Sequence, residues 1–296
     1  MREKSGVKKV HKALTLAAAC VLMIMALPLT AYADMGPKPS VQISFTGIAG
    51  ETYYGTLLSE SMSTGPASAW DGTEADARYP DGEYEIWKAF TQDEDTAGFY
   101  FLQVWWDCSE TGELKWTYYP PSTFKVLLYF PNSGDFYVSP IYTRYAFDSY
   151  FTVDLAGRQN GGLIAEKSYD YTLEIVSFAA RTVLTVLLEL GIAWLFGYRE
   201  KRLFSFLVPV NVITQILLNV LLNIINYNSG SMVFTFSYLL IEIAVFVIEA
   251  VLYALLLQRY SAEPQNRGKA VCYALISNAA SFAAGFWIAH WIPGIF

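Results

Sequence analysis

The sequence is poor in the residues that most often build catalytic and metal sites. Only two of its 296 residues are histidine and three are cysteine, and Cys20, Cys108 and Cys272 fall in three different regions. A Ser-His-Asp site, a Cys-His site, the usual Cys/His zinc site and an intramolecular disulfide are therefore excluded from the acidic half defined below. We expect a protein without enzymatic activity, cofactor or bound metal.

Charged residues are also few, at 16% of the chain against 54% hydrophobic, and they are distributed unevenly. Residues 34–170 hold 20 acidic and 8 basic side chains, a net charge of −12, whereas residues 171–296 hold 6 and 7, a net charge of +1. An acidic half lacks the basic surface that nucleic acid requires and leaves cations or basic surfaces as partners. The apolar excess is typical of a chain that lies partly in a membrane.

Residues 1–33 have the pattern of a secretory signal peptide. A basic start precedes an apolar run over residues 13–29, and Ala31-Tyr32-Ala33 forms an A-x-A cleavage site. An uncleaved membrane anchor and a lipoprotein modified at Cys20 are the alternatives. With cleavage before Asp34, the following residues are extracytoplasmic.

Residues 34–172 are predicted to form an acidic extracytoplasmic domain of short strands separated by turn residues. The expected strands cover residues 41–46, 51–58, 83–90, 98–107, 114–118, 124–130, 136–139, 149–155 and 169–176. This spacing, with no evident helix, favours an all-β, antiparallel sandwich of immunoglobulin-like kind.

Residues 173–296 contain four apolar runs long enough to cross a bilayer, which predict a transmembrane four-helix bundle. They lie near 178–197, 203–226, 233–258 and 270–292. No Gly, Ser or Pro-rich linker separates the last strand from the first helix, so we expect a rigid join.

Basic residues in the joining segments give an orientation. Arg199, Lys201 and Arg202 follow the first run, and residues 258–269 carry three further basic residues, whereas residues 227–232 are uncharged. Positive loops face the cytoplasm. Residues 34–172 and the C-terminus are therefore expected outside a bacterial cytoplasmic membrane, in agreement with the signal peptide.

The apolar runs contain polar residues that are costly to place in lipid. We expect Arg181, near an outer end, to reach the membrane surface. The remaining group, which we call the membrane polar cluster, consists of Glu189, Asn211, Gln215, Asn219, Glu242, Glu249 and Asn278. Glu242 and Glu249 are seven residues apart and share a helix face.

Depth along the helices assigns these groups to two layers. At 1.5 Å per residue, Glu189, Gln215 and Glu242 fall near the middle, and Asn211, Glu249 and Asn278 fall together nearer the cytoplasm. A satisfied polar core that fixes helix register, a cluster with one protonated glutamic acid, and a cation site are the alternatives.

Three motifs in these runs resemble a family of uncharacterised bacterial membrane proteins of clostridial type. They are N-x-x-T-x-x-x-x-N from Asn211, E-x-x-x-x-x-x-E-x-x-x-Y from Glu242, and S-N-x-x-S-F-x-x-G from Ser277. The resemblance covers roughly the last 95 residues. The resemblance implies that the bundle is a unit. No known activity comes with it.

Aromatic residues of the acidic half form a candidate ligand surface for a sugar or cell-envelope polymer: Trp105, Trp106, Trp116 and Tyr118. Packing in a sheet is the alternative, and Trp105 and Trp106 are expected to face opposite sides of a strand. The leading hypothesis is a non-enzymatic membrane protein with an outer binding or sensing domain, in contact with the lipid bilayer and with a further membrane subunit or envelope ligand. The second is a small proton- or cation-coupled transporter or channel component that uses the buried glutamates.

Overall fold

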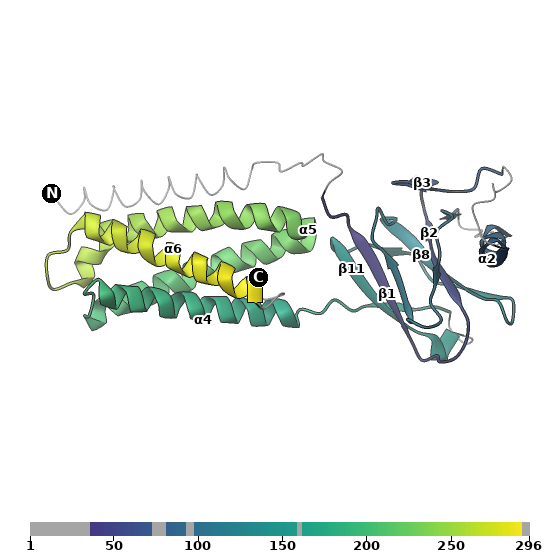
Figure 1. Cartoon of the computed structure of the whole chain (residues 1–296), viewed down its shortest axis with the longest axis horizontal. Coiled ribbons are helices and arrows are strands. Elements are labelled where there is room, and N and C mark those ends of the chain that lie inside the picture. Colours follow the sequence, from purple (N-terminus) through teal and green to yellow (C-terminus); the bar gives the residue numbers. More distant parts are fainter. Residues whose placement is uncertain (1–35, 73–80, 93–97, 159–161, 292–296) are drawn as a thin grey trace. The chain divides into compact units, whose positions relative to one another are not determined.

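The computed structural model describes residues 36–72, 81–92, 98–158 and 162–291 (Figure 1). It divides at Asp170 into two parts, which we call the β unit, residues 36–169, and the helical unit, from residue 170 onward. The predicted signal peptide and Cys20 lie outside the described residues, as does the C-terminus whose location the sequence predicts.

Short strands make up most of the β unit. Its elements are β1 (Ser40–Thr46), β2 (Tyr54–Ser59), β3 (Ser63–Thr64), β4 (Ala67–Ser68), α2 (Asp81–Gln92), β5 (Tyr100–Phe101), β6 (Trp106–Asp107), β7 (Glu113–Trp116), β8 (Thr123–Phe130), β9 (Asp135–Val138), β10 (Tyr142–Thr143), β11 (Asp148–Asp154), the 3-10 turn η1 (Leu155–Gly157) and β12 (Ala165–Lys167). One sheet has the order β12-β11-β1-β7. A second has the order β10-β8-β2-β5, with β6 also paired to β2 and β9 to β8, and β3 and β4 form a separate ribbon.

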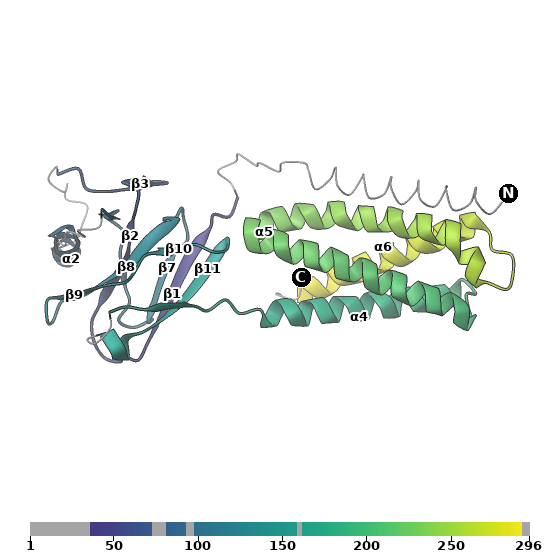
Figure 2. The same ribbon diagram turned by 180° about the vertical axis from the view of Figure 1, so that it is seen from behind.

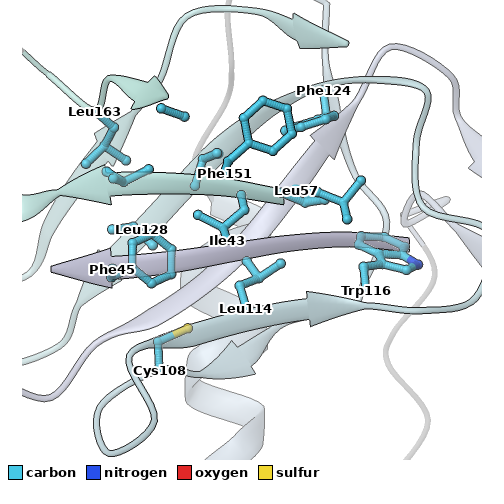
Figure 3. Close-up of a cluster of buried hydrophobic side chains, with 14 of the residues drawn as sticks. Ile43, Phe45, Leu57, Cys108, Leu114, Trp116, Phe124, Leu128, Phe151 and Leu163 are labelled. Carbon is cyan, nitrogen blue, oxygen red and sulfur yellow. The ribbon is translucent and has the colours of Figure 1, made fainter. Parts of the chain in front are cut away.

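The two larger sheets share one hydrophobic core. Val41, Ile43 and Phe45 of β1 are buried, because alternate residues of a pleated strand face the same side. They pack with Leu57 of β2 and Leu128 of β8, as Figure 3 shows. A β region with several sheets is therefore confirmed.

The prediction of a purely antiparallel arrangement is wrong for one pair of strands. β1 and β11 run parallel, with Val41 opposite Ser149, and β1 pairs antiparallel with β7 on its other side. β1 and β11 stand near opposite ends of the unit's chain. Turn residues predict hairpins between neighbouring strands and carry no information about such a pairing.

The all-β description also fails, because residues 83–90, predicted as a strand, lie within helix α2. Trp87 and Phe90 are buried against Phe101 and Leu127, on the face of the second sheet that points away from the shared core. Their spacing of three residues fits one face of a helix. The predicted strand at 98–107 is likewise divided into β5 and β6, and Gln103 between them has a φ of 61°.

Four helices follow the β unit, as predicted. They are α4 (Thr172–Leu195), α5 (Lys201–Tyr260), which contains two of them, and α6 (Arg267–Trp291). The predicted strand at 169–176 is wrong because α4 begins there, and the Thr172 N–H donates a hydrogen bond of 2.8 Å to Asp170 Oδ1 at its start.

Helix α5 reverses direction at a single glycine. Gly230 has a φ of 79° and a ψ of 177°, which break the helix into residues 201–229 and 231–260, called the first and second arms below. Figures 1 and 2 show the arms lying side by side, with α4 and α6 along them. The uncharged loop predicted at 227–232 is thus helix on both sides of Gly230.

Replacing Gly230 with alanine should destabilise the helical unit, because the backbone angles at this position are adopted almost only by glycine. We expect a loss of about 1–3 kcal/mol, measured by thermal unfolding of the full chain in detergent. Gly191→Ala in α4 is the matched control, since an added Cβ there meets no heavy atom within 4 Å. Equal stability of the two variants would contradict this account of the turn.

Candidate functional site

Polar side chains lie among apolar clusters in the interior of the helical unit, and apolar side chains cover its exterior. All seven residues of the predicted membrane polar cluster are buried, and the most exposed of them, Glu242, is only 7% exposed. Large apolar side chains that are exposed include Val183, Leu187, Ile213, Leu217, Ile224, Leu239, Ile243, Val247 and Ile276. This pattern is the reverse of a soluble domain, in which charged residues are almost never fully buried.

Glu249 is the most extensively bonded carboxylate of this interior. It accepts hydrogen bonds from Thr214 Oγ1 at 2.6 Å, from Asn278 Nδ2 at 2.7 Å and from the Tyr253 hydroxyl at 3.5 Å. The Tyr253 hydroxyl also lies 3.1 Å from Asn211 Oδ1. One carboxylate therefore joins both arms of α5 to α6.

Glu189 of α4 lies beside this group without a hydrogen bond of its own. Its side chain is fully buried, and neither of its carboxylate oxygens has a hydrogen-bond partner within the described residues. Its charged neighbours are Glu249 and, more weakly, Glu242. The Asn211 amide also lies close enough to stabilise its carboxylate, although no hydrogen bond of good geometry joins them. We call Glu189, Asn211, Thr214, Glu249, Tyr253 and Asn278 the Glu249 cluster.

Glu242 belongs to a second group that includes a cation. Arg181 is only 8% exposed, contacts Asn219 at 3.5 Å and interacts electrostatically with Glu242 and Tyr238. A cavity of about 10 Å³ is lined by Arg181, Gln215, Tyr238 and Glu242, among others. We call Arg181, Gln215, Asn219, Tyr238 and Glu242 the Glu242 cluster. The expectation that Arg181 reaches the membrane surface is wrong, because it is held inside by this acidic and amide group.

The structure corrects the predicted layers in one respect. Asn211 and Asn278 lie with Glu249, and Gln215 lies with Glu242, as predicted. Glu189 interacts most strongly with Glu249 and only secondarily with Glu242, the glutamate that it was expected to accompany. The depth estimate counted from residue 178, whereas α4 begins at Thr172. The six additional residues place Glu189 about 9 Å deeper.

Both basic joining segments lie at the same end of the helical unit. Glu200 accepts hydrogen bonds from Ser261 Oγ at 3.0 Å and from the Ala262 N–H at 2.9 Å, and Lys269 Nζ lies 4.9 Å from the centre of the Tyr198 ring. The turn at Gly230 marks the opposite end. Charge is therefore segregated along the helices.

The four predicted aromatic residues of the β unit do not form one surface. Trp106 and Trp116 pack against each other at the shared core, with ring centroids 5.3 Å apart. Tyr118 is exposed and contacts Tyr119, whereas Trp105 lies on the α2 side of the second sheet and lines a cavity. Trp105 and Trp106 thus point in opposite directions.

The predicted membrane polar cluster leaves out four members of these clusters, Arg181, Thr214, Tyr238 and Tyr253, although Thr214 and Tyr253 belong to the motifs noted above. Tyr238 and Tyr253 each lie four residues from a buried glutamate, a spacing that places them on the same helix face. Thr214 lies three residues after Asn211 and directly before Gln215, beside the same stripe. These spacings were available signals, whereas the inward position of Arg181 required the helix packing.

Comparison of the chain with models of protein families, with curated proteins and with solved structures finds no match. By length and composition, two helices among the described residues, Glu174–Leu195 and Lys201–Tyr260, are apolar enough to cross a membrane. Function must therefore be argued from the residues themselves.

Removing Glu249 should destabilise the helical unit, while removing Glu189 should not. Glu249→Leu leaves the Asn278 amide and the Thr214 hydroxyl without their carboxylate partner, at a cost of about 1–3 kcal/mol. Glu189→Leu removes a carboxylate that has no partner within the described residues. Thermal unfolding of both variants in one detergent measures the difference, and a larger loss for Glu189→Leu would contradict the assignment.

Proposed function

We propose that the chain is a polytopic integral protein of a bacterial cytoplasmic membrane, with four membrane-spanning helices and an extracytoplasmic β-sandwich of immunoglobulin-like kind that binds or senses a ligand. The observation that carries the proposal is the reversed polarity of the helical unit. In a bilayer, exposed Leu, Ile and Val side chains lie in hydrocarbon without a free-energy cost. The polar side chains are kept away from lipid and find partners inside the bundle. In water, an apolar surface over whole helices would promote aggregation.

Burial of the apolar helices also supports a lipid environment. In the most apolar 18-residue stretch of each helix, only 22% of the stretch in Glu174–Leu195 and 28% of the stretch in Lys201–Tyr260 is buried. The central helix of a soluble domain would be covered by protein over most of its surface, whereas a membrane helix is covered by lipid.

The segregated charges support one orientation. The two segments that join the first span to the second and the third span to the fourth carry six basic residues. Hydrogen bonds of Glu200 connect these two segments, so all six basic residues lie at one end of the helical unit. Positive segments remain in the cytoplasm, so α4 runs inward and the β unit lies outside.

An extracytoplasmic reporter should distinguish the two ends of the helical unit. Alkaline phosphatase fused after residue 200 should be inactive in a bacterial host, and the same enzyme fused after residue 229 should be active. The full chain should also stay with the membrane pellet during alkaline carbonate extraction. Release into the aqueous fraction, or the reverse activity pattern, would overturn the proposed topology.

A second candidate function, proton- or cation-coupled transport, is favoured by the Glu249 cluster. Glu189 is fully buried beside Glu249, and its oxygens lack hydrogen-bond partners within the described residues. A buried carboxylate beside a second carboxylate inside a bundle is suited to take up and release a proton or a monovalent cation.

In proteoliposomes, this candidate function predicts ion or proton flux by the wild-type chain. Glu189→Gln and Glu249→Gln should abolish the flux, since a carboxamide does not ionise at neutral pH and carries no negative charge to bind a proton or a cation. Glu174→Gln at the start of α4 is the control and should retain it. Wild-type proteoliposomes without flux would remove transport from consideration and leave the membrane topology untouched.

A further inference from the structure

The β unit contains a cavity that the helical site does not explain. It has a volume of about 640 Å³ and lies between the first turns of α2 and the segment that joins β5 to β6. Tyr54, Glu83, Gln103, Trp105 and Asp107 are among the described residues that line it. Its volume falls within the range of about 300–1,000 Å³ that is usual for small-molecule sites.

The wall of the cavity is held in place by hydrogen bonds to neighbouring elements. Thr56 Oγ1 donates to the Val104 carbonyl at 2.6 Å, which fastens the segment to β2. Gln103 has a φ of 61°, rare for a residue other than glycine, and its side chain is used at both ends. Its Oε1 accepts from Trp87 Nε1 at 3.2 Å, and its Nε2 donates to the Ser68 carbonyl at 3.1 Å. The wall is therefore preorganised.

Strand alternation explains which side chains reach the cavity. Trp105 and Asp107 lie two residues apart and face the same side, whereas Trp106 between them packs toward Trp116. Tyr54 is the direct partner of Asp107 across β2 and β6. An aromatic surface and a carboxylate therefore meet at one edge of the second sheet.

The negative charge of this cavity is not neutralised within the described residues. Neither Asp107 nor Glu83 forms an ion pair there, whereas Glu51, elsewhere in the unit, pairs with Arg158 at 2.9 Å. Asp107 accepts one hydrogen bond, from the Ser109 N–H at 2.9 Å. Burial raises the pKa of Cys108 to about 12, and the negative charge of Asp107 contributes to this shift. The pKa of Tyr54 is raised by the same two causes. The field of Asp107 thus reaches its neighbours.

We propose that this cavity binds a small organic cation, whose ammonium or guanidinium group pairs with Asp107 and Glu83 and whose carbon chain lies against Trp105. Charge-assisted hydrogen bonds to carboxylates and contact with an aromatic face are the interactions that recognise such a group. A neutral sugar would use the aromatic ring but would leave both carboxylates without a counter-charge. The inference rests on the proposed ligand-binding role of the β unit and names its ligand class.

Calorimetric titration of the purified full chain in detergent tests the site. The probes are 1,5-diaminopentane, a tetralysine peptide and the neutral control 1,5-pentanediol. We expect saturable binding of the diamine that weakens as NaCl is raised, and no binding of the diol. Asp107→Asn and Glu83→Gln should each weaken binding by about tenfold. Glu113→Gln, at an exposed position of β7 outside the cavity, should leave binding unchanged.

Tighter binding of tetralysine than of the diamine would support the same site with a lysine side chain of a polypeptide as the source of the cation. No saturable binding of either cation, equal binding of the diol, or unchanged affinity in both cavity variants would overturn the inference. Circular dichroism of each variant checks that the fold is kept. A chain that resists carbonate extraction yet binds no cation refutes the ligand class alone, whereas a chain released by carbonate refutes the membrane proposal alone.

Discussion

The structure of the helical unit depends on the need to satisfy the Glu249 carboxylate away from water. An isolated buried carboxylate costs several kcal/mol, and this cost is offset only where donors converge on it. Thr214 and Asn278 supply those donors from the first arm of α5 and from α6. A shift of either helix by one residue would turn its donor away, so the carboxylate fixes the register that apolar contacts alone leave loosely defined.

The remaining features of the helical unit follow from that interior. Gly230 allows the two arms to lie antiparallel, which brings Thr214 level with Glu249. Arg181 supplies the positive charge that a second buried glutamate, Glu242, requires. Glu189 lies in the same interior, and its carboxylate oxygens form no hydrogen bond among the described residues. The same is true there of Thr182 Oγ1, Tyr198 Oη and Asn211 Nδ2, so this core is not fully satisfied.

Much of this organisation could be predicted from the sequence, because apolar runs of spanning length and polar residues within them are signals that each segment carries by itself. The four helices and the burial of the glutamates follow from such signals. The partners of each polar residue do not follow from such signals. The sequence pairs Glu189 with Glu242 because it places the start of α4 too late. It places Arg181 at the membrane surface because the acidic neighbours of Arg181 lie on other helices. In the β unit, residues 83–90 are rich in aromatic and β-branched residues, which favour a strand, but the three-residue spacing of Trp87 and Phe90 fits one face of the helix that packs against the second sheet.

Spin labels on the exterior of the helical unit give the most direct test of its reversed polarity. Labels at Leu187 and Val247, which are 64% and 54% exposed, should be accessible to molecular oxygen and protected from a water-soluble nickel chelate when the full chain is in lipid vesicles. A label at Glu113, an exposed position of β7, should show the opposite preference. If the labels on the helices are as accessible to the nickel chelate as the label on β7, the apolar surface faces water and the proposed membrane location is wrong.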